Sequence, residues 1–123
     1  MGLAPSAELN GYPGPLHVLE HGAALDLTLA QRQGTEGLMA AMRAEAVPLG
    51  EAVIEAESHL DRRFREGGLG VAELNAAVAR IATLQGELRV AHLRSHLAVA
   101  ELLTPAQIDS YNRLRGYAVP AVP

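Results

Sequence analysis

Two long stretches of the chain repeat apolar or small residues in steps of three and four, the spacing of one face of an α-helix. In residues 28–65 these positions are Met39, Met42, Ala46, Leu49, Val53, Ala56 and Leu60. In residues 71–102 they are Leu74, Ala77, Ile81, Leu84, Leu88, Ala91, Ser95, Ala98 and Leu102. Each stretch therefore predicts a long helix with one apolar seam, and the two seams can pack together.

Glycine and proline indicate where the helices end or bend. The segment Gly67-Gly68-Leu69-Gly70 predicts a turn between the two long helices, which makes them an antiparallel hairpin. Pro48 lacks the N–H for one helical hydrogen bond, so we expect a bend near Glu45. Short helices are expected over residues 16–21 and 105–115, each preceded or begun by a proline. The predicted fold is all-α: a bent hairpin with a short helix at each end, four helices in total.

The rest of the chain sets the domain limits. Residues 1–15 are punctuated by proline and glycine and are predicted to be irregular. Residues 16–117 form a single helical domain, and residues 118–123 are predicted to be an unstructured tail. A second apolar stripe on the late part of the second long helix, Val90, Leu93 and Leu97, predicts that this half is buried on two sides. One hairpin cannot cover that stripe, so we expect a homodimer.

Composition narrows the function. The chain has 123 residues and no cysteine, which excludes disulfides, thiolate metal sites and a cysteine nucleophile. All ten basic residues are arginine, so there is no Schiff-base or phosphate-loop lysine. A net charge of −4 argues against nucleic-acid binding, and no apolar run is long enough to span a membrane. No nucleophile–base pair or catalytic carboxylate pair stands out, so we expect a non-enzymatic protein.

A short motif occurs twice, once just before the first long helix and once just before the last short helix. In each copy a leucine precedes a threonine N-cap, and a glutamine three residues after the threonine can reach back to the cap as in a capping box. The six residues are Leu27, Thr28 and Gln31, and then Leu103, Thr104 and Gln107. A single capping box is common, but two copies at these places are more specific.

This L-T-x-x-Q pair, bracketing a helical domain of this size, resembles the Spy/CpxP-like periplasmic proteins. Their relatives include zinc-resistance-associated proteins and nickel/cobalt sensors. The resemblance covers roughly residues 16–117. It implies a cradle-shaped dimer of bent hairpins in the periplasm, which either holds unfolded proteins or senses and buffers metal. The start Met1-Gly2-Leu3 lacks the charged and apolar regions of a signal peptide, so a leader would have to be removed upstream, or the protein is cytosolic.

Four of the five histidines form two pairs with a spacing of four residues, which puts both imidazoles of a pair on one helix face. The pairs are His17 with His21, and His92 with His96. This spacing lets one helix supply two ligands to a metal ion. His92 and His96 lie between the main seam and the second stripe, so we expect them in a groove. If the first short helix packs there, all four imidazoles could hold Zn, Ni, Co or Cu.

The resemblance implies a metal site in the same region of the chain. The nickel/cobalt sensors carry H-x-x-x-H on a short helix before the first L-T-x-x-Q, which His17 and His21 match. They carry H-x-x-x-M late in the return helix, where His92 and His96 correspond with histidine replacing methionine. The sensors' glutamate ligand falls near Met39, so Glu36 is only a weak candidate, as are Met39 and Met42, which core packing also explains.

Other interpretations remain open. The histidines could be solvated surface residues or could titrate as a pH response, and the unpaired His59 is expected at the surface. A second functional interpretation is an ATP-independent chaperone or stress adaptor. It would bind unfolded clients or an envelope signalling protein without metal, although the acidic charge argues against this. A third is a cytosolic helical interaction module with convergent caps.

Overall fold

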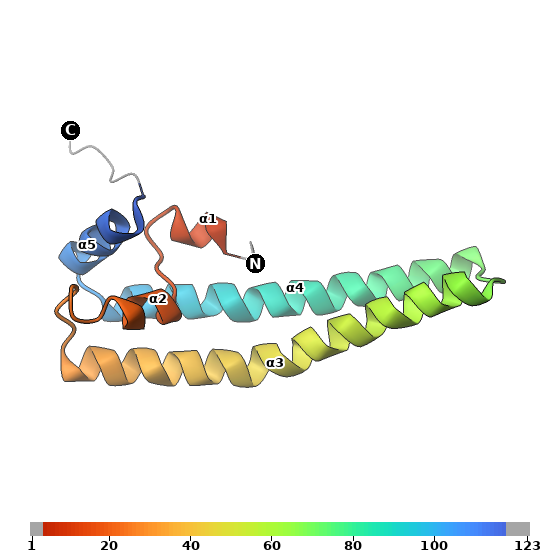
Figure 1. The fold of residues 1–123 in the computed structure, drawn as a ribbon, viewed down its shortest axis with the longest axis horizontal. Coiled ribbons are helices and arrows are strands. Elements are labelled where there is room, and N and C mark those ends of the chain that lie inside the picture. Colours follow the sequence, from red (N-terminus) through yellow and green to blue (C-terminus); the bar gives the residue numbers. More distant parts are fainter. Residues whose placement is uncertain (1–3, 118–123) are drawn as a thin grey trace.

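The computed structural model describes residues 4–117 and consists of helices and connecting turns. In chain order the helices of this range are α1 (Pro5–Glu8), α2 (Pro15–Glu20), α3 (Leu29–Glu66), α4 (Val71–Leu102) and α5 (Pro105–Arg115). The all-α prediction is confirmed. Helices α3 and α4 run side by side as a long antiparallel hairpin, and the other three gather at its base (Figure 1). Within residues 4–117, no helix is both long and apolar enough to cross a membrane.

The boundaries of the hairpin follow the local signals in the sequence. Thr28 is the N-cap of α3, and its side-chain oxygen accepts a hydrogen bond from the Gln31 N–H at 3.0 Å, while the Gln31 side chain accepts one from the Thr28 N–H at 3.0 Å. At the tip, Gly67 and Gly68 have φ angles of 79° and 78°, a conformation that favours glycine. The predicted turn and both helix lengths are therefore confirmed.

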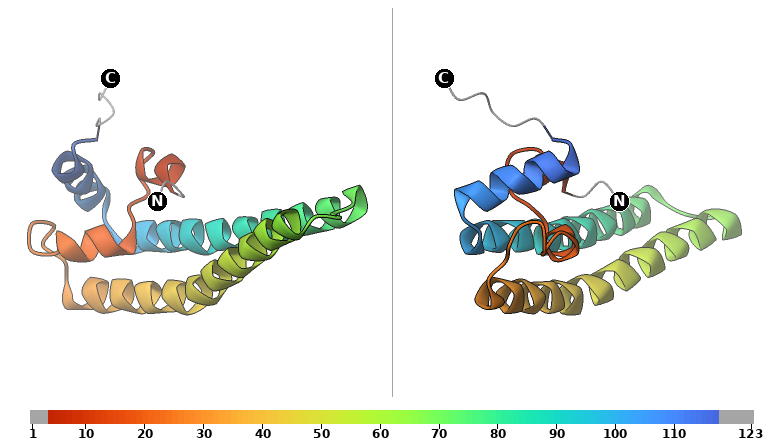
Figure 2. Two further views of the ribbon diagram at one scale, coloured as in Figure 1. Left: turned by 45° about the vertical axis from the view of Figure 1, so that its right-hand side comes forward. Right: turned by 60° about the vertical axis from the view of Figure 1, so that its left-hand side comes forward.

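Helix α3 continues through Pro48 and bends near its middle, which turns the tip half away from the line of the base half (Figure 2). The bend has a local cause, because proline lacks an N–H and its ring displaces the preceding turn. All positions of both predicted seams are buried or partly buried. The hairpin is thus held by the two seams that the sequence predicts.

The N-terminal segment differs from its prediction. Residues 5–8 form α1, so the expectation of an irregular segment over residues 1–15 is wrong there, and the described chain has five helices where four were expected. Pro5 occupies the first turn, where its fixed φ favours a helix and its missing N–H costs nothing. Gly11, with a φ of 85°, reverses the chain afterwards. The prediction for residues 118–123 lies outside the described residues.

The main core lies at the base of the hairpin, where α2, the end of α4 and α5 meet. Its buried side chains are Val18, Leu25, Val99, Leu103 and Tyr111. Between Ala46 and Ile81, by contrast, no side chain is buried, because the seams in this half contain several alanines and only two helices meet. Packing is therefore concentrated at the base, and the tip half is held mainly by partly buried contacts.

The two capping boxes bond to each other across the base. Thr104 caps α5 as Thr28 caps α3, with Gln107 completing its capping box. In addition, Gln31 Nε2 donates to Gln107 Oε1 at 2.7 Å, and Gln107 Nε2 donates to Gln31 Oε1 at 2.9 Å. The same amides also donate to the backbone carbonyls of Leu102 and Leu25. The repeated motif therefore fixes the start of α3 against the start of α5, besides capping each helix.

The second stripe of α4 is only partly covered within one chain, and its burial by a second copy stays a prediction; Leu93 is partly buried. The Val90 and Leu97 side chains are 51% and 57% exposed. Helix α3 covers the main seam, whereas Val90 and Leu97 stay largely open to solvent within residues 4–117.

Candidate metal site

A pocket of about 520 Å³ beside the base of the hairpin gathers five of the predicted ligands from three helices. They are His17 on α2, Met39 and Met42 on α3, and His92 and His96 on α4. The pocket forms because α2 packs against both long helices, and because the segment between α1 and α2 passes over α4. The structure therefore brings the first short helix next to the late part of α4, the packing on which the four-histidine hypothesis depends.

His96 is the most enclosed of the histidines, with only 6% of its surface exposed. Its Nδ1–H donates to the backbone carbonyl of Tyr12 at 2.7 Å. A proton on Nδ1 leaves Nε2 with its lone pair. Histidines that bind metal commonly donate their other ring N–H to a carbonyl or a carboxylate in this way.

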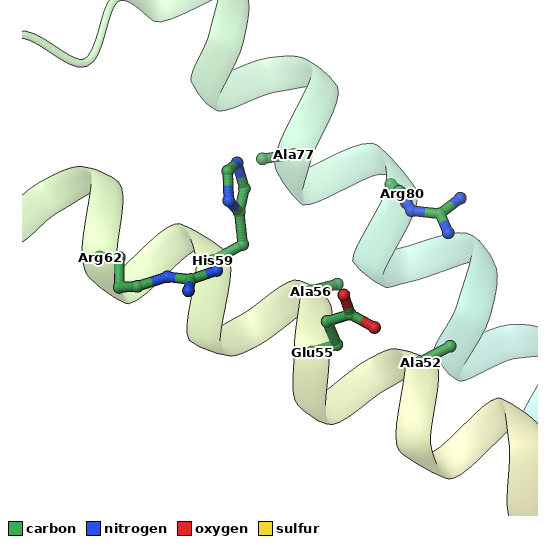
Figure 3. Close-up of a pocket in the computed structure, with 7 residues that line it drawn as sticks. All are labelled: Ala52, Glu55, Ala56, His59, Arg62, Ala77 and Arg80. Carbon is green, nitrogen blue, oxygen red and sulfur yellow. The ribbon is translucent and has the colours of Figure 1, made fainter.

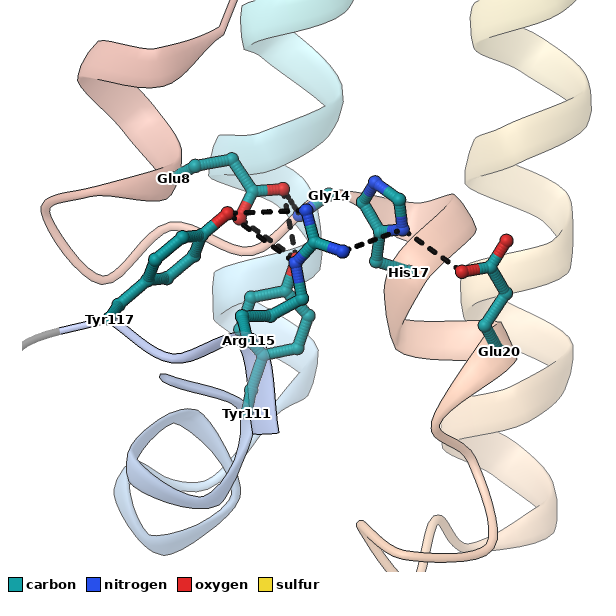
Figure 4. A network of polar contacts seen from close by, with 7 residues as sticks. All are labelled: Glu8, Gly14, His17, Glu20, Tyr111, Arg115 and Tyr117. Carbon is teal, nitrogen blue, oxygen red and sulfur yellow. Dashed lines mark hydrogen bonds and ion pairs between the residues drawn. The ribbon is translucent and has the colours of Figure 1, made fainter. Parts of the chain in front are cut away.

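His17 has a similar arrangement with a different partner. Its Nδ1 lies 3.0 Å from Glu20 Oε2, and this hydrogen bond holds the pKa of the Glu20 carboxyl below its usual value (Figure 4). In the neutral tautomer that donates from Nδ1 to Glu20, Nε2 keeps its lone pair. However, Arg115 Nη1 lies 3.5 Å from the same Nδ1. The positive charge of this arginine would repel a metal ion bound at His17.

His92 is partly buried, one helical turn before His96. Burial, and to a smaller extent the neighbouring His96, lowers the pKa of His92. Both effects disfavour the imidazolium form. The neutral imidazole is the form that binds metal ions, so His92 is held in the competent state at neutral pH.

Two other candidates lie outside this pocket. His21 is the C-cap of α2, and Glu36 is an exposed residue of α3; neither lines the pocket. Within residues 4–117, no three histidine or carboxylate side chains lie close enough together to hold a metal ion. The imidazole and thioether groups that line the pocket are donors that borderline or soft metal ions prefer. They do not, however, form a preorganised site. The four-histidine site therefore stays a prediction.

Two charged residues of the pocket were not predicted from the sequence. Glu8 projects from α1, and Arg115 comes from the last turn of α5. Neither shows a sequence signal, because α1 lies in a segment that reads as irregular, and Arg115 reads as an ordinary basic residue at a helix end. Tyr111 Oη donates to the Glu8 carboxylate, and Arg115 lies between Glu8 and His17 (Figure 4).

A second pocket, of about 250 Å³, lies between α3 and α4 in the tip half (Figure 3). Its floor is formed by alanines, and its polar groups are Glu55, His59, Arg62 and Arg80. All four are exposed, which agrees with the prediction for His59. In Figure 3 the Arg80 guanidinium and the His59 ring lie far apart along the groove. The polar groups do not converge, so this pocket is a weaker candidate.

Comparison with known proteins adds no assignment: no family model matches the chain, and no curated protein or solved structure is significantly similar to it. The functional argument therefore rests on the residues of the pocket.

Proposed function

We propose that this protein binds a transition-metal ion, of the Zn, Ni, Co or Cu type, in the pocket at the base of the hairpin. The observation that carries the proposal is that one pocket is lined by His17, His92 and His96, from two helices, together with Met39 and Met42. Imidazole and thioether donors suit these metals and not Mg²⁺ or Ca²⁺. As in the proteins that the sequence resembles, the role would be metal sensing, buffering or resistance in the periplasm.

The histidine tautomers support this proposal. His17 and His96 each have an oxygen acceptor at Nδ1, which leaves both Nε2 atoms available. We expect the site to be centred on His92 and His96, because Arg115 lies beside His17. If His17 of α2 also binds the metal, the ion would join the short helix to α4 and would stabilise that arrangement by mass action.

Isothermal titration with Zn²⁺, Ni²⁺, Co²⁺ and Cu²⁺ tests the proposal. We expect wild-type protein to bind at least one of them and the double variant His92→Ala/His96→Ala to lose most of that affinity. Bound metal should also raise the free energy of unfolding, by about 2.7 kcal/mol at a free concentration a hundred times the Kd.

The matched control is His59→Ala, which removes an exposed histidine far from this pocket and should bind like wild type. His21→Ala separates the four-histidine arrangement from one that uses the pocket residues alone. Unchanged affinity in the His92/His96 variant would remove these residues from the site, and no binding by wild type would end the proposal.

We also propose that the chain forms a homodimer through the faces that it leaves uncovered. Exposed apolar residues occur in pairs seven residues apart, which puts each pair on one helix face: Val47 with Ile54, Val71 with Val78, and Val90 with Leu97. Analytical ultracentrifugation should give the mass of two chains, and Val90→Gln/Leu97→Gln should weaken the association. Leu114→Gln, which changes an exposed residue of α5, is the control.

The same exposed apolar side chains favour the chaperone as the second candidate function. An aggregation-suppression assay separates the two candidates. Strong protection of an unfolding client by protein freed of metal, with no change on adding metal, would favour the chaperone. Protection that requires metal would connect the two functions.

A further inference from the structure

Residues 4–12 form a segment, here called the N-terminal strap, whose backbone hydrogen bonds are made within itself. Ala7 and Glu8 donate their N–H groups to the Ala4 carbonyl. Asn10 and Tyr12 donate theirs to the Ala7 carbonyl. Helix α1 lies inside the strap and has no buried residue. The strap can therefore move as a unit without losing backbone hydrogen bonds or much buried apolar surface.

The chain is anchored directly after the strap. Pro13 is fully buried, and the buried Pro15 begins α2, which packs against the hairpin. Gly14, between them, lies against the His96 ring, because a Cβ on Gly14 would be only 3.0 Å from that ring. Movement of the strap would therefore pivot at the junction of Tyr12 and Pro13.

Within residues 4–117, two side chains of the base helices form hydrogen bonds to the strap. Tyr111 Oη donates to the Glu8 carboxylate, whose oxygens lie 2.9 and 2.8 Å away (Figure 4). His96 Nδ1 donates to the Tyr12 carbonyl at 2.7 Å. Tyr111 is fully buried, and burial together with the Glu8 carboxylate raises the pKa of its phenol well above the usual value. The phenol therefore stays a donor to Glu8.

The strap forms one wall of the base pocket. Four of its residues line that pocket together with the histidines: Ala4, Pro5, Glu8 and Leu9. His96, whose side chain binds the strap directly, is only 6% exposed. Moving the strap away would remove this wall and would separate the Tyr12 carbonyl from the His96 ring.

We infer that the N-terminal strap is a lid over the base pocket and that the hydrogen bond from Tyr111 to Glu8 is the latch that keeps it closed. Opening the lid would admit small molecules and ions to the pocket while the hairpin stays folded, because the core around Val18 and Val99 contains no residue of the strap. The lid controls access whatever the pocket binds, so this inference goes beyond the proposed function and does not require a metal.

The reaction of each histidine with diethyl pyrocarbonate, which modifies accessible neutral imidazoles, tests the lid in metal-free protein. Arg94 lies between His92 and His96, so trypsin separates the two and mass spectrometry gives a rate for each. In wild type, His96 should react several-fold more slowly than the exposed His59. Glu8→Ala removes the latch, and His96 should then react about tenfold faster, the change in opening equilibrium expected from losing a hydrogen bond to a charged group.

Two tyrosine variants separate the latch from a general loosening of the base. Tyr111→Phe removes only the hydroxyl on the other side of the latch and should also speed the reaction of His96. Tyr117→Phe is the matched control, because its hydroxyl lies in the same region and accepts from Arg115 instead of donating to Glu8. This control should leave the His96 rate at the wild-type value.

Three results would overturn the inference: equal reactivity of His96 and His59 in wild type, wild-type rates at His96 in both latch variants, or an equal acceleration by Tyr117→Phe. Circular dichroism checks that each variant keeps its helices. If Tyr111→Phe does not fold, Glu8→Ala decides, since it changes a residue of the partly exposed α1. Metal titration of wild type bears on the proposed function alone.

Discussion

Two glycines of α3, three residues apart, have opposite surroundings. A Cβ on Gly34 would lie 3.0 Å from Leu102 Cδ1, whereas nothing lies within 4 Å of a Cβ on Gly37. Gly34 thus marks the place where α3 and the end of α4 approach closely. Gly37 is a helix-interior glycine with no such role, and its flexibility in the unfolded chain only costs stability.

Replacing each glycine by alanine should separate these roles. We expect Gly37→Ala to raise the free energy of unfolding by about 0.5–1 kcal/mol, the usual gain for alanine over glycine in a helix. Gly34→Ala should gain less or lose stability, because Leu102 must move. Urea denaturation measures both, and equal gains at the two positions would show that the approach of Leu102 imposes no constraint.

At the scale of elements, the hairpin has two unlike halves. The base half packs against α2 and α5, and it contains the core around Val18 and Val99. The tip half has no buried side chain between Ala46 and Ile81. Its clearest polar contact is the pair of hydrogen bonds from Arg63 to Glu73, at 2.7 and 3.0 Å, which joins the end of α3 to the start of α4.

We expect this difference to appear in amide hydrogen exchange. Amides in residues 50–80 should exchange faster than those in residues 29–46 and 81–102, because few apolar contacts are lost when the tip opens. Mass spectrometry of peptides from the exchanging protein checks this at low concentration, where a dimer dissociates. Uniform protection along the hairpin would contradict it.

We expect the exposed Arg63–Glu73 pair to make the tip somewhat less stable in acid. The hydrogen bond from Arg63 and its charge hold the pKa of Glu73 below the ordinary value of about 4.3. A depressed carboxyl pKa in the folded state stabilises the protein at neutral pH, and this contribution is lost as the pH falls through that depressed value. Glu73→Gln should therefore loosen the tip at pH 7 by amide exchange and differ little from wild type in strong acid. Glu57→Gln, an exposed change on α3, is the control.

At the scale of the whole molecule, Gln31 and Gln107 connect parts of the chain that are far apart in sequence. Each glutamine completes its own capping box and donates its amide to the other, so the starts of α3 and α5 are fixed together. The side chains are partly buried, so losing one partner leaves polar groups of the other unpaired.

A double-mutant cycle tests this connection. Gln31→Ala and Gln107→Ala should each lower the free energy of unfolding by about 1–3 kcal/mol. The double variant should lose less than the sum, with a coupling of about 0.5–3 kcal/mol, because the second change no longer removes the shared bonds. Gln85→Ala, an exposed change on α4, is the control. Additive losses would mean that the two caps act independently.

The sequence by itself determined where the long helices begin, bend and end. Thr28, Pro48, Gly67 and Thr104 act on their own turns of chain, and the apolar period of each long helix fixes which face is covered. Such signals are local, so they can be read without knowing the neighbours. The paired spacing of the histidines likewise follows from helix geometry alone.

Only the tertiary structure decided which side chains meet at the base. It brought Glu8 to Gly14 and His96, set Arg115 beside His17, left His21 outside the pocket, and left Val90 and Leu97 uncovered. These meetings depend on how α1, α2 and α5 pack on the hairpin, across separations of tens of residues. Helix propensity does not tell where the short helices pack, because their positions depend on the core that they share with α4.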